Sequence, residues 1–245
     1  MRVPAIGRDV LSLILSCEHA SGHVPKRYAH AFAGKDAVSA LATHRGLDLG
    51  AVRLARDLAK KLAVPLLEGR LTRLLIDLNR SPGHKNQLSE WSRRLSDAHI
   101  EELEAIHAAH WHEIFERVRA AQGLVTHVAV HTFTPVLHDD VRNFDVGLLY
   151  DPGQKREVAL AQRLRSALTL RGFLVRRNAP YRGVADCLPT AIRRSFSPAR
   201  YVGLELEINQ QLLWHAPDPP RQKQLFLGLH EVLVSERDSQ RSRSS

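Results

Sequence analysis

Two histidines stand at the carboxyl ends of apolar, strand-like runs. His19 comes shortly after residues 11–17 (LSLILSC), and His131 follows residues 124–130 (LVTHVAV). A rigid strand fixes the direction of an imidazole ring, so histidine at a strand end is a common metal ligand. The alternative is two unrelated surface histidines. If the two strand ends meet, the pattern predicts a metal site.

Polar residues in the segment 43–48 (THRGLD) could complete such a site. His44 and Asp48 precede or open an expected helix over residues 47–62. An acid at this place can simply cap the helix, because acids are favoured near helix N-termini. Asp48 could instead be a third ligand, since two histidines and one carboxylate form a catalytic zinc set with one position open for water.

The segment 201–208 (YVGLELEI) is an apolar strand that carries two glutamates. With the two-residue period of a strand, Glu205, Glu207 and Asn209 share one face. Burying two carboxylates is costly unless they are paired or solvated at a site. A glutamate near zinc can act as a general base toward the activated water. The alternative is a solvent-facing edge strand.

The run 71–78 (LTRLLIDL) is expected to be another strand, and it ends in Asp77-Leu78-Asn79-Arg80. Arginine offers a two-pronged donor that suits a carboxylate, and asparagine adds a neutral donor. Arg73 could join the same site. A surface salt bridge is the alternative interpretation.

Residues 107–113 (HAAHWHE) have the best local spacing for a metal, with His107 and His110 on one helix face. The segment has no H-E-x-x-H pattern and lies inside an expected helix over residues 97–122, capped by Ser96 or Asp97. We therefore expect these histidines to lie on the helix surface.

The composition is that of an ordinary globular protein, with 245 residues, 44% hydrophobic and 25% charged. No apolar run approaches the roughly 18 to 20 residues that cross a bilayer, and the N-terminal run is more typical of a buried strand than of a signal peptide. We expect a cytoplasmic protein with no membrane partner, in which Cys17 and Cys187 are free thiols.

The net charge is +9, from 35 Lys and Arg against 26 Asp and Glu. The arginines are scattered and form no basic block, so the charge does not favour a nucleic-acid partner. No G-x-G-x-x-G or P-loop motif is present, and nucleotide binding by those motifs is therefore unsupported.

The expected elements alternate between strands and helices. This alternation predicts an α/β domain, with a mostly parallel or mixed sheet and helices on both faces. We expect one domain over residues 1–234 and a disordered polar tail over 235–245. Expected helices are 47–62, 97–122, 157–170 and 221–234, and expected strands are 11–17, a short one after Pro65, 71–78, 124–130, 146–150, 173–176 and 201–208.

Taken together and in this order, the motifs resemble those of the N-formylglutamate amidohydrolase family. Each motif is weak alone, but the ordered set runs from about residue 11 to about 234. The segments that carry the resemblance are 16–21 (SCEHAS) with Pro25, 44–51, 73–80, 131–135 (HTFTP) with Arg142, 178–181 (NAPY) and 206–209 (LEIN).

The resemblance implies a three-layer α/β/α fold similar to zinc carboxypeptidases, with one bound Zn²⁺. It implies hydrolysis of the C–N bond of a small acidic N-acyl amino acid, such as N-formylglutamate. His19 and His131 are then zinc ligands. Asp48 is the expected third ligand, and Glu18 and His44 are the alternatives.

The resemblance also implies roles around the metal. Glu207 is the expected general base, and Asn79 with Arg80 would grip the substrate carboxylate. Arg73 or Arg142 would stabilise the oxyanion, and Arg142 is also a candidate for substrate binding. Two other functions fit the same residues: a non-catalytic binder of acidic small molecules on the same fold, or a zinc peptidase of other specificity.

Overall fold

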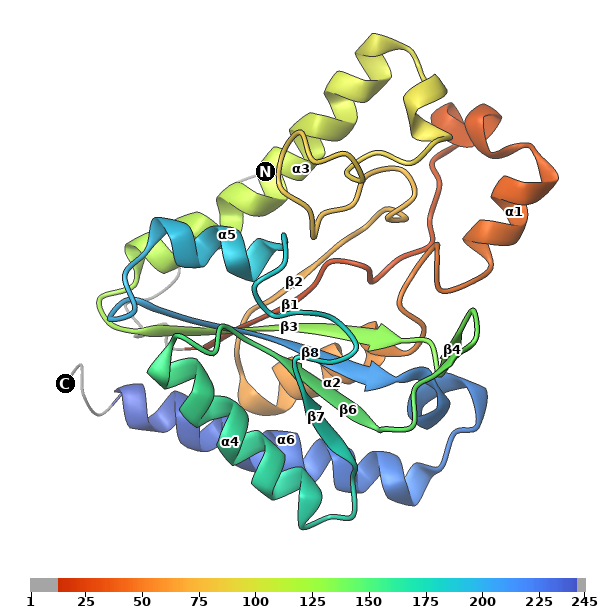
Figure 1. Cartoon of the computed structure of the whole chain (residues 1–245). Helices are drawn as coiled ribbons and strands as arrows, with labels where there is room; N and C mark the ends of the chain where they lie inside the picture. The colour runs from red at the N-terminus through yellow and green to blue at the C-terminus, as the bar shows by residue number, and fades with distance from the viewer. Residues whose placement is uncertain (1–12, 242–245) are drawn as a thin grey trace.

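The computed structural model describes residues 13–241, in which a six-stranded sheet lies between two layers of helices (Figure 1). The strand order is β2-β1-β3-β8-β6-β7. β1 pairs in parallel with β2 and β3, and β3 with β8, while β6 is antiparallel to β8. The predicted mixed sheet is therefore confirmed. The strands are β1 (Leu13–Cys17), β2 (Leu66–Glu68), β3 (Val125–Phe133), β6 (Val146–Leu149), β7 (Val175–Arg177) and β8 (Tyr201–Asn209).

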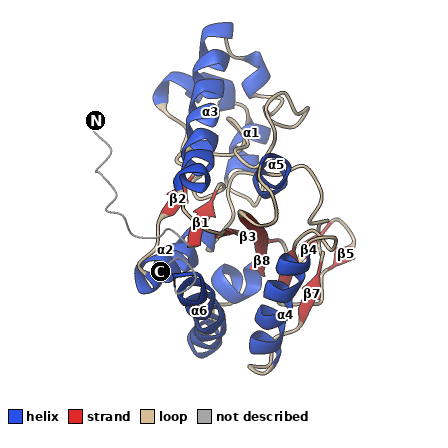
Figure 2. Cartoon of the chain, turned by 90° about the vertical axis from the view of Figure 1, so that its left-hand side faces the viewer, coloured by secondary structure: helices blue, strands red, loops and turns tan. Residues whose placement is uncertain are grey.

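Helices cover both faces of the sheet, as predicted (Figures 1 and 2). On one face, α2 (Ala51–Leu62), α4 (Lys155–Thr169) and α6 (Pro219–Arg241) bury their apolar sides against the strands. On the other face, α3 (Asp97–Ala120) and α5 (Leu188–Ser195) pack in a separate apolar cluster. Within residues 13–241, none of the helices is both long enough and apolar enough to span a membrane.

The sequence explains these elements locally. β3 is rich in valine and all nine of its residues are buried, as expected for a strand in the middle of a covered sheet. In α2, Leu54, Leu58 and Leu62 recur at the helical period and face the core. α3 begins as predicted, because the Ser96 hydroxyl accepts a hydrogen bond from the backbone of His99.

A third apolar cluster lies beyond the sheet and was not predicted. It joins η1 (Lys26–Phe32) and α1 (Lys35–Leu41) to the start of α3, around Trp91. Such short helices contain too few apolar positions to produce a clear period. The remaining short elements are η2 (Ser92–Arg94), β4 (Val136–Leu137), β5 (Asp140–Val141) and η3 (Gln211–His215).

The expected strand over residues 71–78 is wrong: this run is buried but forms successive turns. Leu75 donates its backbone N–H to Thr72, and the Asp77 carboxylate accepts from the backbone of Asn79. Aspartate in such a turn offers the chain a local alternative to strand pairing. An apolar run of this length shows burial, but it does not by itself determine the secondary structure.

The expected end of the last helix at Val234 is also wrong, because α6 continues to Arg241. Residues 235–241 are therefore helical rather than a disordered tail, and Glu236 is buried and paired with Arg163. Polar composition is typical of a tail, but it is equally typical of a helix turn that uses ion pairs. Residues 242–245, like residues 11 and 12 of the first expected strand, lie outside the described chain.

Gly50 sets the path from Asp48 into α2. It is the N-cap residue of that helix and has a φ of 87°. Two residues earlier, Asp48 is fixed by a hydrogen bond from its backbone N–H to the His19 carbonyl, at 3.0 Å. A Cβ atom at Gly50 would lie 2.6 Å from Cβ of Leu213. Both the backbone conformation and the packing therefore require glycine here.

We expect Gly50→Ala to lower the free energy of unfolding more than Gly172→Ala. Gly172 has a similar φ of 83°, but no atom of the described chain, residues 13–241, lies within 4 Å of its would-be Cβ. Both variants should lose about 1–2 kcal/mol from the left-handed conformation, and Gly50→Ala about 1–3 kcal/mol more from overpacking. Urea unfolding of the two variants and the wild type measures the difference. Equal losses would contradict the packing argument.

Candidate metal centre

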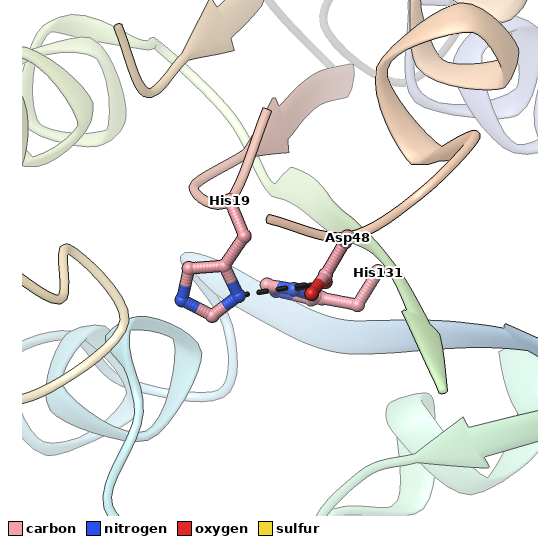
Figure 3. Close-up of side chains that lie close together, drawn as sticks. All are labelled: His19, Asp48 and His131. Atoms are coloured by element: carbon pink, nitrogen blue, oxygen red, sulfur yellow. Dashed lines mark hydrogen bonds and ion pairs between the residues drawn. The ribbon is translucent and has the colours of Figure 1, made fainter. Parts of the chain in front are cut away.

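Three side chains from distant parts of the sequence meet at the carboxyl ends of β1 and β3 (Figure 3). Oδ2 of Asp48 lies 2.9 Å from Nδ1 of His131 and 3.4 Å from Nδ1 of His19. All three residues are buried, and one ligand atom from each lies within 4.8 Å of the others. The two strand-end histidines thus share one site, and a carboxylate lies between them.

Of the three residues considered as a third ligand, Asp48 is the one placed between the imidazoles. It does not cap α2, whose N-cap is Gly50 without a side-chain cap bond. Glu18 points to the opposite side of the His131 ring, 3.1 Å from Nε2. His44 is half-buried and takes no part in this cluster.

The outer nitrogen of each imidazole faces a buried carboxylate. Nε2 of His19 is hydrogen-bonded to Oδ1 of Asp77 at 2.7 Å, and Nε2 of His131 lies 3.1 Å from Oε2 of Glu18. Carboxylates in this position fix the tautomer and direction of metal-binding histidines. Neither of these two roles was predicted, although Glu18 adjoins His19 in the sequence and Asp77 belongs to the segment 73–80.

The donor set fits a divalent metal ion. Nδ1 of His19 is buried and, in the chain from residue 13 to 241, has no hydrogen-bond partner. Two imidazole nitrogens and one carboxylate oxygen form a set that zinc accepts, with room for a further ligand. His19, Asp48 and His131 could therefore hold the metal.

The charges of this cluster depend on one another. Burial by itself lowers the pKa of His131, but the contacts with Asp48 and Glu18 outweigh it and raise that pKa well above its usual value. Burial would raise the pKa of Asp48, and His19 and His131 hold it below its usual value instead. Asp77 likewise has a lowered pKa despite burial, chiefly because of Arg73.

The two glutamates of β8 face the same site. β8 lies between β3 and β6, so the edge-strand interpretation is wrong. Glu207 pairs in register with His131, and its Oε2 is buried with no hydrogen-bond partner within residues 13–241. Burial raises the pKa of Glu207 to about 8, and the charges of Asp48 and Glu205 act in the same direction.

A cavity of about 220 Å³ opens beside these groups. Its size suits a small molecule rather than a polymer. It is lined by His19, Asp48, Arg73, Asn79, Arg80, His131, Thr132, Leu149, Tyr181, Arg182, Ala185, Asp186, Cys187, Glu205 and Glu207.

Arg73 lies at the wall of the cavity between two acids. Its guanidinium donates to Oδ2 of Asp77 at 2.8 Å and lies 3.6 Å from Oδ1 of Asp48. Its side chain remains partly exposed, so a positive charge borders the space beside the metal cluster.

Asn79 and Arg80 both reach the cavity but are used differently. The Asn79 amide donates to Glu205 at 2.8 Å and accepts from the Leu188 backbone at 2.9 Å, so both of its ends already have protein partners. Arg80 uses Nη1 to bond the carbonyl of Asp186. Its Nη1 also donates to the carbonyl of Asn79. Among residues 13–241, no hydrogen bond is formed by the other guanidinium nitrogens, which can therefore bind a ligand.

Arg142 is not part of the cavity wall. It is buried after β5, over the rings of Phe133 and Tyr181, and its Nη1 lies 3.4 Å from the Tyr181 hydroxyl. Tyr181 itself lines the cavity, and sequence analysis named it only within a motif. Arg142 therefore contacts the site through Tyr181.

The expectation that His107 and His110 lie on the surface of α3 is wrong. His107 is buried and its Nε2 is hydrogen-bonded to the carbonyl of Arg80 at 2.8 Å. His110 is largely buried and faces Glu18. The local pattern showed that the two histidines share a helix face, but only the tertiary packing shows that this face is turned inward.

Comparisons with known proteins find solved structures with the same fold. The chain superimposes on the gene product Atu2144 from Agrobacterium tumefaciens with a TM-score of 0.72 and 26% identity, over 93% of this chain and 91% of that one. An N-formylglutamate amidohydrolase from Ralstonia eutropha JMP134 has the same fold, with a TM-score of 0.69 and 18% identity over 94% and 95% of the two chains.

A metallo-carboxypeptidase from Burkholderia cenocepacia aligns with a TM-score of 0.40 and 14% identity, over 95% of this chain and 58% of that one. Among curated proteins, none matches. The model of the N-formylglutamate amidohydrolase family matches residues 11–214. The chain therefore belongs to the N-formylglutamate amidohydrolase family.

Proposed function

We propose that this chain is a zinc-dependent hydrolase that cleaves the C–N amide bond of a small N-formyl or N-acyl amino acid, such as N-formylglutamate. The observation that carries the proposal is the buried cluster of His19, Asp48 and His131 beside a cavity with a buried acid and arginines. Membership of the family supports the same reaction class.

One Zn²⁺ would be held by His19, Asp48 and His131, with Asp77 and Glu18 orienting the two imidazoles. When bound, zinc lowers the pKa of a water molecule to about 7 and polarises a carbonyl group.

Glu207 is the proposed general base. It would accept a proton from the attacking water as the new C–O bond forms, and give that proton to the leaving amine as the C–N bond breaks. An acid–base group works best when its pKa lies near the working pH. Burial raises the pKa of Glu207 to about 8 in the metal-free chain, and the positive charge of a bound zinc ion would lower it again, so that the carboxylate can accept the proton. Its buried Oε2, with no partner within residues 13–241, is available for this exchange.

The arginines would bind and polarise the substrate. Among residues 13–241, the hydrogen bonds of Arg80 occupy only Nη1 of its guanidinium, so its other nitrogens would grip a carboxylate in the two-pronged manner that suits guanidinium. Arg73 lies beside Asp48 and would stabilise negative charge on the acyl oxygen. Asn79 would bind the substrate together with Arg80 only if its amide gave up its present hydrogen bond to Glu205. Arg142 would contribute indirectly, by fixing the position of the Tyr181 side chain.

The size of the cavity favours an amino-acid derivative over a peptide. A volume of about 220 Å³ accommodates one amino acid with a small acyl group. This supports the amidohydrolase proposal against a peptidase of other specificity.

Zinc-loaded protein should contain about one metal ion per chain, by elemental analysis. Chelation should abolish hydrolysis of N-formylglutamate, and added zinc should restore it. Asp48→Asn should weaken zinc binding, since a charged ligand is lost, whereas His44→Gln, from the same segment but outside the cluster, should not. Binding of acidic ligands without turnover would instead identify a non-catalytic binder.

Glu207→Gln should reduce kcat by at least about 10²-fold, because the amide cannot accept the proton. Its zinc content should be unchanged, since Glu207 is outside the cluster of ligands. Glu205→Gln is the matched control on the same strand face, and it should reduce kcat far less. Near-normal turnover of Glu207→Gln would show that another group is the base.

Glu207 should also make the stability of the metal-free protein depend on pH. Its pKa is about 8 when folded, against an ordinary value of 4.5, so the folded state keeps a proton that the unfolded state has lost. The free energy of unfolding contributed by this group therefore falls as pH rises between those values. Glutamine does not titrate, so Glu207→Gln should gain stability relative to the wild type across this window in urea unfolding. A constant difference would contradict the raised pKa.

A further inference from the structure

Glu18, the carboxylate that faces the outer nitrogen of His131, is completely buried and therefore needs partners of its own. It follows β1 and lies on the side of His131 that faces away from Asp48, with its Oε2 3.1 Å from Nε2 of that imidazole. Its side chain is 0% exposed. A carboxylate in such a place is costly unless other groups compensate its charge and fill its hydrogen-bonding capacity.

The second group that faces Glu18 comes from a different part of the chain. His110 lies on α3, the long helix that rises from one end of the sheet (Figure 1), and its Nε2 is 3.8 Å from Oε1 of Glu18. The His110 side chain is only 9% exposed. Glu18 therefore lies between two imidazoles, one from β3 and one from α3.

The other half of the cluster shows what such an arrangement does. Asp77, which holds the outer nitrogen of His19, is itself fixed by Arg73 at 2.8 Å and by the backbone N–H of Asn79 at 2.9 Å. The carboxylate that orients an imidazole is thus held by donors of its own. On the His131 side, His110 is in the place that Arg73 takes on the His19 side.

We propose that His110 and Glu18 form a positioning pair for the metal ligand His131. Oε2 of Glu18 faces Nε2 of His131 at 3.1 Å, and a proton held on Nε2 by this carboxylate would leave the lone pair of Nδ1 directed toward Asp48 and His19. Nε2 of His110 and Oε1 of Glu18 are both buried and have no hydrogen-bond partner among residues 13–241. They face each other at 3.8 Å, so a small movement of either side chain forms a bond that would keep the carboxylate from rotating away. This inference rests on the proposed function, because it assigns His131 to the metal.

Neither His110 nor Glu18 touches the substrate cavity, so both act through His131. The pair should therefore change the affinity of the site for the metal, which can be measured without measuring catalysis.

The test is a double-mutant cycle on zinc affinity, measured in the full chain by competition with a chromogenic chelator. Glu18→Gln should weaken zinc binding by about 10–100-fold, the usual effect of removing an outer partner of a metal ligand. His110→Leu, which keeps an apolar group of similar size, should weaken it in the same direction by a smaller factor. In the double variant, His110→Leu should add little to Glu18→Gln, because His110 acts through Glu18.

Three further variants separate this role from a general loss of packing. His110→Gln keeps a donor near the position of Nε2, so it should recover most of the zinc affinity. His107→Leu removes another buried imidazole of α3, which bonds Arg80 instead, and should leave zinc affinity unchanged. His112→Leu is an exposed control on the same helix. Urea unfolding reports whether each variant is folded.

The possible results discriminate between the two proposals. Wild-type zinc affinity in both Glu18→Gln and His110→Leu would overturn the positioning pair and leave the proposed hydrolase intact. Independent, additive losses, or an equal loss in His107→Leu, would also overturn the pair. A wild-type chain with no affinity for zinc would overturn the proposed function and this inference together. If His110→Leu fails to fold, His110→Ala takes its place in the cycle, with the same expected loss and the same results that would overturn the pair.

Discussion

Compensation of buried negative charge is the constraint on which the site depends. Charges removed from water are stable only when opposite charges or strong donors face them. Here Arg73 and the imidazoles of His19 and His131 lie among the acids and lower the pKa of several of them. Glu207 is the exception, because its pKa rises to about 8. A divalent cation bound by His19, Asp48 and His131 would add positive charge among these buried acids. The buried acids of the site are Glu18, Asp48, Asp77, Glu205 and Glu207.

The sheet makes this concentration of charge possible. β1, β3 and β8 are parallel neighbours, so their carboxyl ends lie at the same edge, where polar groups of open α/β sheets collect. The register places Glu207 beside His131 on adjacent strands. Asp48 lies in a loop instead, and the turn at Gly50, just before α2, fixes its position. Rigid strands thus carry the imidazoles and the base, and one constrained turn carries the remaining acid.

Sequence patterns predicted what is local and missed what depends on packing. The strand before His19 and the face of β8 followed from apolar runs and their period, because those signals lie within a few residues. The strand expected to end before His131 continues to Phe133, so His131 lies near the end of β3 rather than after it. The run 71–78 was placed in a strand because burial alone does not distinguish a strand from buried turns. The inward direction of His107 and His110 depends on where α3 packs, which no local period encodes.

The imidazoles of His19 and His131 each face a buried carboxylate, but these carboxylates and their own partners come from different parts of the fold. Asp77 and its donor Arg73 come from one buried turn, so the His19 side is built from neighbouring residues of the chain. On the other side, Glu18 follows β1, whereas His110 comes from α3. The same helix also bonds the carbonyl of Arg80 through His107. The packing of α3 on the sheet therefore bears on both the candidate metal ligand His131 and the arginine proposed to bind substrate. A displacement of this helix would disturb both, even though the helix contributes no side chain to the wall of the cavity.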